Sequence, residues 1–133
     1  MKLVIIESPF MADSVERAEL HLRYARAALR DSLDRGEAPL ASHLLYTQVL
    51  DDIDPLERAV GINAGLAWYR RATLSAVYDD LGVSRGMELG IQAARDHGIT
   101  VVFRKLNPEK LAGLMKGWVV PDKLGDLMKG WTS

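Results

Sequence analysis

Acidic, hydroxyl and glycine residues are concentrated between residues 76 and 90, where the chain reads AVYDDLGVSRGMELG. The segment begins like the end of a buried strand, continues as a short loop and ends as the start of a helix. Ligands of open α/β sheets bind outside the carboxyl ends of the strands, and the first turn of a helix offers free N–H groups to an anion. Asp79 and Asp80 end the expected strand, and Glu88 follows about one turn into the helix. Carboxylates beside an anion cradle indicate acid–base or nucleophilic chemistry on a phosphate-bearing ligand.

Further polar residues follow the other expected strands of the same sheet. The first strand ends at Glu7, Ser8, Pro9 and Phe10, because proline does not continue a central strand. His43 ends a weaker strand and would lie at the same edge. A ligand-facing loop and a plain connector are both open for residues 7–10, as are a ligand role and a structural role for His43. Arg85, between Ser84 and Gly86, is either a phosphate contact or a surface residue.

The elements that must position these residues alternate along the chain. Apolar runs predict strands at residues 3–6, 38–43, 73–78 and 100–103. Helical spacing and capping signals predict helices over residues 13–35, 54–71 and 84–97, with a further short helix opening at residues 107–109. This alternation predicts an α/β fold, namely a doubly wound, mainly parallel sheet of four or five strands with helices on both faces.

Two helices carry an expected buried face. In the first, the apolar residues at helical spacing are Val15, Ala18, Leu22, Ala25, Leu29 and Leu33, and Asp13 is the expected cap. In the second they are Leu56, Val60, Ala64 and Ala67. Gly61 and Gly65 lie four residues apart in that second helix, and each costs about 1 kcal/mol relative to alanine. A close neighbour is expected at the two glycines: another helix, a dimer partner or a ligand ring.

Composition limits the classes of function. The chain has 133 residues, typical of one domain, and a formal net charge of -1, which argues against binding a nucleic acid polymer. It has no cysteine and therefore no disulfide, no thiolate nucleophile and no cysteine–zinc site. Its histidines lack metal-ligand spacing, and no apolar run approaches the roughly 20 residues of a membrane span. We expect a cytoplasmic protein with no metal, no cofactor and no membrane partner.

The last part of the chain has a different sequence pattern from the rest, because it contains two similar short segments. Residues 113–118 read GLMKGW and residues 126–131 read DLMKGW, which is too few copies for a repeat array. We therefore divide the chain into an α/β domain at residues 1–105 and a tail at residues 106–133. The tail's tryptophans and the glycine pair of the second helix predict a homo-oligomer.

Residues 68–103 also resemble a known family. A helix ending near Trp68, a buried strand, the sequence LGVSRGMELG and a VVFR strand are similar to the nucleoside 2-deoxyribosyltransferase superfamily. The likeness is strongest to its branch of 2'-deoxynucleoside 5'-phosphate N-hydrolases and covers roughly residues 1–105. The resemblance implies a flavodoxin-like or Rossmann-like fold, and cleavage or transfer at the N-glycosidic bond of a nucleoside or nucleotide.

The resemblance also implies roles for particular residues. Glu88 would be the nucleophile at the anomeric carbon, Ser84 and Gly86 would cradle a 5'-phosphate, and Ser8 would face the sugar or phosphate. Thr73 stands where the family has an acidic residue. The proton for the leaving base would then come from one of three acids: Asp79, Asp80 or Glu7.

Three alternatives to catalysis stay open. Glutamate in a first helical turn is favoured by the helix dipole alone, so Glu88 could be structural. The same fold could bind a nucleotide-derived ligand, such as one of the ADP-ribose type, without cleaving it. The chain could also be an assembly protein whose tail drives oligomerisation.

Overall fold

A single four-stranded parallel sheet organises the domain. The structure is a computed structural model that describes residues 1–115. The strands, in the order β2-β1-β3-β4, are β1 (Leu3–Glu7), β2 (Ala38–Leu40), β3 (Leu74–Tyr78) and β4 (Thr100–Arg104). All three strand pairings are parallel. This is the doubly wound α/β class that the alternation of elements predicted.

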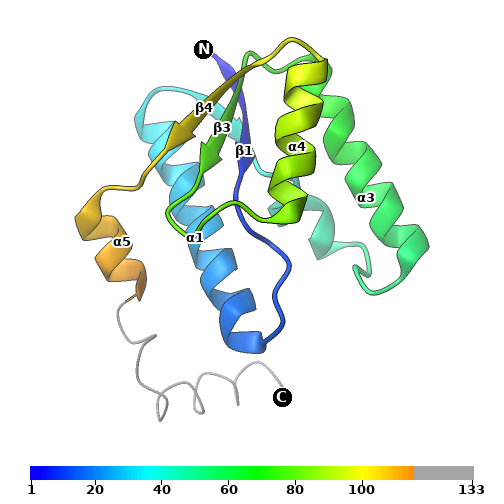
Figure 1. The fold of residues 1–133 in the computed structure, drawn as a ribbon, viewed down its shortest axis with the longest axis horizontal. Coiled ribbons are helices and arrows are strands. Elements are labelled where there is room, and N and C mark those ends of the chain that lie inside the picture. The colour runs from blue at the N-terminus through cyan, green and yellow to red at the C-terminus, as the bar shows by residue number, and fades with distance from the viewer. Residues whose placement is uncertain (116–133) are drawn as a thin grey trace.

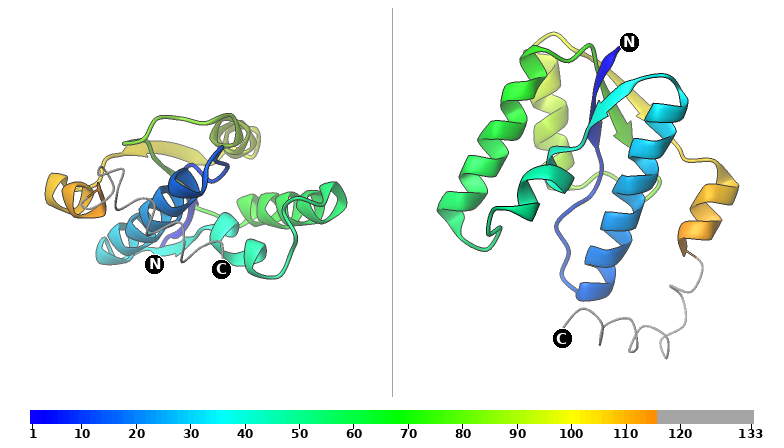
Figure 2. Two further views of the ribbon diagram at one scale, coloured as in Figure 1. Left: turned by 90° about the horizontal axis from the view of Figure 1, so that it is seen from below. Right: turned by 180° about the vertical axis from the view of Figure 1, so that it is seen from behind.

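Helices cover both faces of this sheet (Figures 1 and 2). The helices are α1 (Val15–Asp34), α2 (Ser42–Leu45), α3 (Pro55–Ala67), α4 (Arg85–Asp96) and α5 (Pro108–Met115), with 3-10 turns η1 (Tyr46–Gln48) and η2 (Trp68–Arg70). Side chains of α1 and α5 pack on one face, and those of α4 and the α3–η2 segment pack on the other. The carboxyl ends of β1 and β3 therefore open between the two helical layers.

The two faces of β1 decide where its last residue lies. Val4 and Ile6 pack with Tyr24 of α1, whereas Ile5 packs with Tyr69 on the opposite face. Burial on both faces explains the uninterrupted apolar run. Since side chains alternate along a strand, Glu7 lies on the same face as Ile5, toward α3 and α4.

The predicted helix starts are confirmed with one shift. Asp54 caps α3 by accepting from Leu56 N, and Ser84 caps α4 by accepting from Met87 N. At α1 the cap is Ser14 instead of Asp13.

The predicted face of α1 was partly wrong, although Ala25 is buried and Leu29 packs against the core as expected. The helix buries Leu20, His21, Tyr24, Ala25, Ala28 and Ser32, whereas Leu33 is 56% exposed. Apolar spacing missed this face because His21 and Ser32 are polar members of it, each with a hydrogen-bond partner in the interior.

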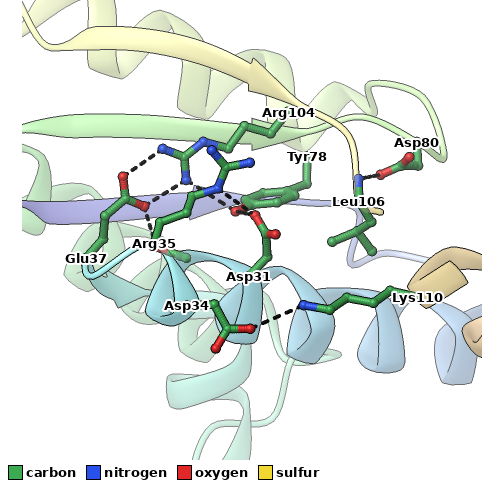
Figure 3. A network of polar contacts seen from close by, with 10 residues as sticks. Asp31, Asp34, Arg35, Glu37, Tyr78, Asp80, Arg104, Leu106 and Lys110 are labelled. Carbon is green, nitrogen blue, oxygen red and sulfur yellow. Dashed lines mark hydrogen bonds and ion pairs between the residues drawn. The ribbon is translucent and has the colours of Figure 1, made fainter. Parts of the chain in front are cut away.

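A polar network fastens α1 to β4 and to the start of β2 (Figure 3). The Arg104 guanidinium donates to both carboxylate oxygens of Glu37, at 2.8 and 2.7 Å, and these side chains are only about one-tenth exposed. Tyr78 OH donates to Asp31 at 2.7 Å, and Arg35 pairs with the same carboxylate at 2.9 Å. The Arg104–Glu37 pair is buried, whereas the Arg35 side chain is 47% exposed, and the network lies on the α1 face of the sheet, away from Glu7.

The folded domain continues past residue 105. Leu106 is 3% exposed in the core beside α1, and Leu111 and Leu114 of α5 pack against the same core. Trp118 and the repeat at residues 126–131 lie outside the described residues, as does the rest of the tail that was expected to drive oligomerisation. No helix within residues 1–115 is long and apolar enough to cross a membrane.

Candidate functional site

Glu7 ends β1 and is partly exposed, and its carboxyl group lies between η2 and α4. Tyr69 OH donates a hydrogen bond to Glu7 Oε1. A Cβ atom added at Gly90 of α4 would overlap the same oxygen, so a larger residue there would force the carboxyl group to move. Burial raises the pKa of Glu7 to about 7, against the opposing effect of the Tyr69 hydrogen bond. Near neutral pH this group can therefore both donate and accept a proton.

Ser8, the next residue in the chain after Glu7, meets His43. The distance between Ser8 Oγ and His43 Nε2 is 2.8 Å, and the Phe10 ring stands edge-on to the imidazole with centroids 6.0 Å apart. Burial lowers the pKa of His43 to about 4, so its imidazole is neutral near pH 7 and offers one donor and one acceptor. His43 lies in the short helix α2, not at the end of β2 as predicted.

The two aspartates at the end of β3 are engaged elsewhere. Asp80 accepts from Tyr24 OH at 2.6 Å and from Leu106 N at 2.9 Å, which ties the loop to α1 and to the chain after β4. Asp79 forms an ion pair with Lys105, 2.9 Å between Oδ1 and Nζ. Asp80 thus has a structural role, and Asp79 is the less tightly held of the pair.

At the start of α4, the groups that could bind an anion are mainly backbone N–H groups and only to a lesser extent side chains. Ser84 Oγ accepts from Met87 N at 3.3 Å, so the hydroxyl group is used as the helix cap. Arg85 and Gly86 are exposed, and N–H groups at the first helical positions have no intrahelical acceptor. An anion at this helix start would contact the N–H groups of Arg85 and Gly86 and the Arg85 side chain.

Glu88 is exposed on the first turns of α4. Within residues 1–115 its carboxylate forms no hydrogen bond or ion pair. Gly90, which faces Glu7, is two residues further on, and two residues turn a helix by about 200°. The carboxylates of Glu88 and Glu7 therefore project from different sides of α4 and do not share one notch.

The sequence predicted Glu7 as a binding residue and as one of three candidate acids, but it did not single out Glu7 as the desolvated carboxyl group of the site. A signal was present: an acidic residue directly follows a strand buried on both faces. Its partners, Tyr69 and Gly90, are 62 and 83 residues away in the sequence, and no local pattern connects them to it.

An apolar hollow of about 210 Å³ lies along β1 and β2, next to η2. Residues 3–5 and 38–40 line it together with Trp68, Arg71 and Ala72. Neither Glu7 nor Ser8 belongs to this lining.

Fold and site together define a doubly wound α/β domain with a buried carboxyl group and a serine–histidine pair at the carboxyl edge of its sheet. The chain belongs to the family described as "Domain of unknown function (DUF7768)", whose model matches residues 2–104. No curated protein and no solved structure matches the chain. The family description names no activity.

Proposed function

We propose that this protein binds a nucleoside or nucleotide at the carboxyl edge of its sheet and cleaves, or transfers at, the N-glycosidic bond. Two things support this proposal: the resemblance to the nucleoside 2-deoxyribosyltransferase superfamily, and the position of the Glu7 carboxyl group between Tyr69 and Gly90, where burial raises its pKa to about 7. Cleavage of this bond needs an acid for the departing base and a carboxylate or water for the anomeric carbon.

Glu7 supplies the acid in this scheme. As the bond between C1' and the base nitrogen breaks, its electron pair passes to the base, which takes a proton from the Glu7 carboxyl group. The anomeric carbon then bonds directly to water, because Glu7 and Glu88 project from different sides of α4. The bond to the Glu88 carboxylate that the resemblance implies is the alternative, and it needs a rearrangement that brings both carboxyl groups to one substrate. In either route one water molecule supplies the final hydroxyl group on C1' and returns a proton. Transfer replaces that water with a second base.

The binding roles follow the same arrangement. The 5'-phosphate is placed at the N–H groups of Arg85 and Gly86, next to the Arg85 side chain. Ser8, held by neutral His43, is placed to hydrogen-bond the sugar, with Phe10 beside them. Asp79 and Asp80 stabilise the loop after β3, Asp79 by its ion pair with Lys105 and Asp80 by the hydrogen bond that it accepts from Tyr24.

Chromatography of free base tests the proposal. Wild-type protein is incubated with deoxynucleoside and ribonucleoside 5'-monophosphates, in parallel with Glu7→Gln, Glu88→Gln and Asp79→Ala. Glu109→Gln is the matched control, because Glu109 is also an exposed glutamate in a first helical turn. We expect base release that falls about 10²–10⁴-fold in Glu7→Gln and is unchanged in Glu109→Gln.

The Glu88 variant separates the two routes to C1'. Loss of release in Glu88→Gln identifies a glycosyl-enzyme route, whereas retained release identifies direct attack by water. An absence of base release from every nucleotide in the panel would contradict the enzymatic proposal.

A second candidate function is binding without cleavage of a nucleotide-derived ligand of the ADP-ribose type. It is favoured by the separation of Glu88 from Glu7 around α4, which leaves the expected nucleophile outside the enclosed site. Calorimetry would then show binding of intact nucleotide, weakened in Ser8→Ala, with no base released. Either function concerns a small molecule, and a cytoplasmic setting for it remains our prediction.

A further inference from the structure

Helix α3 presents apolar side chains to solvent. Leu56 is 79% exposed and Val60 is 58% exposed, and Ala59, Asn63 and Ala67 beside them are exposed as well. These five residues, called the α3 stripe below, recur at three- and four-residue steps and so share one side of the helix. The sequence predicted Leu56, Val60 and Ala67 as part of a buried face, and within residues 1–115 nothing covers them.

The opposite side of α3 is occupied within the same chain. A Cβ atom added at Gly65 would lie 2.7 Å from Ser42 Oγ, and one added at Gly61 would lie 3.2 Å from Leu50 Cδ1. The close neighbour expected at the glycine pair is therefore α2 and the loop after it. An oligomer contact on α3 must use the stripe instead of the glycines.

Charge is segregated at the two ends of the stripe. Asp51, Asp52, Asp54 and Glu57 lie at the start of α3, and Arg70 and Arg71 follow its end. Residues 59–69 contain no charged residue. Arg58 is two residues from Leu56, so it projects from the far side of the helix. Arg70 and Arg71 are exposed and form no ion pair within residues 1–115.

We propose that the α3 stripe is the docking surface for a second copy of this chain, with the two α3 helices antiparallel about a two-fold axis. A two-fold interface must be complementary to itself. Antiparallel pairing is complementary in two ways. The apolar stripes of the two copies contact each other, and the acidic start of each α3 lies beside the arginines at the end of the partner's α3. A parallel pairing would instead place acid on acid.

The antiparallel pairing of the two α3 helices predicts which residue lies on the two-fold axis. The charged ends lie at residues 51–57 and 70–71, so the axis passes close to Asn63. Helices packed about 8–10 Å apart bring residues on the axis to within disulfide range. The natural chain has no cysteine, so one introduced cysteine reports on this contact alone.

Sedimentation velocity of the full-length chain from about 1 to about 100 micromolar tests the docking surface, because such concentrations bracket the affinity of a small interface. We expect reversible dimers whose dissociation constant rises at least about tenfold in Val60→Glu. Leu33→Glu is the control, since Leu33 is 56% exposed on α1 and lies outside the stripe. Circular dichroism verifies that each variant is folded.

Charge-reversal variants and single-cysteine variants test the antiparallel arrangement. Arg70→Glu with Arg71→Glu should weaken the dimer, and adding Asp51→Arg with Asp52→Arg should restore it. Oxidised Asn63→Cys should form a disulfide-linked dimer, and oxidised Leu33→Cys should remain monomeric. A wild-type chain that is monomeric throughout would overturn the proposal. So would a dimer that Val60→Glu leaves unchanged, which would locate the contact elsewhere, for example on residues 116–133.

Discussion

Burial changes the chemistry of Glu7 more than hydrogen bonding does. Its carboxyl group is largely desolvated between β1 and α4, although the residue as a whole stays partly exposed, and the hydrogen bond from Tyr69 compensates only part of the cost of ionisation. The folded pKa of about 7 lies above the ordinary value of 4.5, so the folded state holds this proton more tightly than the unfolded state does. By linkage, ionised Glu7 opposes folding.

We predict that Glu7→Gln makes stability less dependent on pH. The stabilisation from protonated Glu7 is complete below pH 4.5 and is lost as the pH rises to about 7. The free energy of unfolding of the variant, relative to wild type, should therefore increase across this window by about 3 kcal/mol. Urea unfolding over a pH series measures it. A difference that stays constant with pH would show that Glu7 ionises as freely in the folded protein as in the unfolded chain.

At the scale of elements, α4 approaches β1 closely only because residue 90 is a glycine. We predict that Gly90→Ala destabilises the protein by about 1–3 kcal/mol, because the new methyl group displaces a buried, hydrogen-bonded carboxyl group. Gly86→Ala in the same helix is the control, since its Cβ would have 4.0 Å to the nearest atom and should be neutral or stabilising.

A double-mutant cycle assigns the cost of Gly90→Ala to Glu7. In a Glu7→Ala background the clash disappears, so Gly90→Ala should cost less than in the wild type by at least about 1 kcal/mol. Additive effects would locate the strain at some other neighbour of α4. Chemical denaturation of the four proteins provides all of the required values.

The link between β4 and the start of β2 depends on a buried ion pair. We predict that Arg104→Met lowers the free energy of unfolding by about 3–5 kcal/mol, because Glu37 keeps a buried charge without its partner. Arg104 also holds the pKa of Glu37 below its usual value. Arg30→Met, at an ion pair whose arginine is 74% exposed, should cost less than about 1 kcal/mol. Similar losses in the two variants would contradict the importance of burial.

At the scale of the whole molecule, the folded domain and the family match end at different residues. The match ends at residue 104, whereas Leu106, Leu111 and Leu114 complete the core beside α1. We predict that a chain ending at residue 104 is less stable than one ending at residue 115 by at least about 3 kcal/mol, chiefly through loss of buried leucine surface. Thermal and urea unfolding of the two truncations measure this. Equal stability would show that α5 is dispensable.

The α3 stripe shows why the expected burial of a helix face can be wrong. Leu56, Val60 and Ala67 have the spacing of a core face, but the glycine side of α3 is the one that α2 contacts. An apolar stripe destined for a core and one destined for a second copy have the same composition. Only the placement of the neighbouring elements distinguishes them.

Sequence alone determined the strands, the order of elements, the parallel sheet and the caps at Asp54 and Ser84, because these follow from periodicity and from local hydrogen bonds. It also indicated that Glu7, Ser8 and His43 would gather at one edge. Tertiary structure decided which carboxyl group is enclosed. Glu7 meets Tyr69 and Gly90, Asp80 is tied to Tyr24, and Glu88 faces solvent. Burial and hydrogen-bond partners are set by residues distant in the chain, and the pKa of a carboxyl group follows from both.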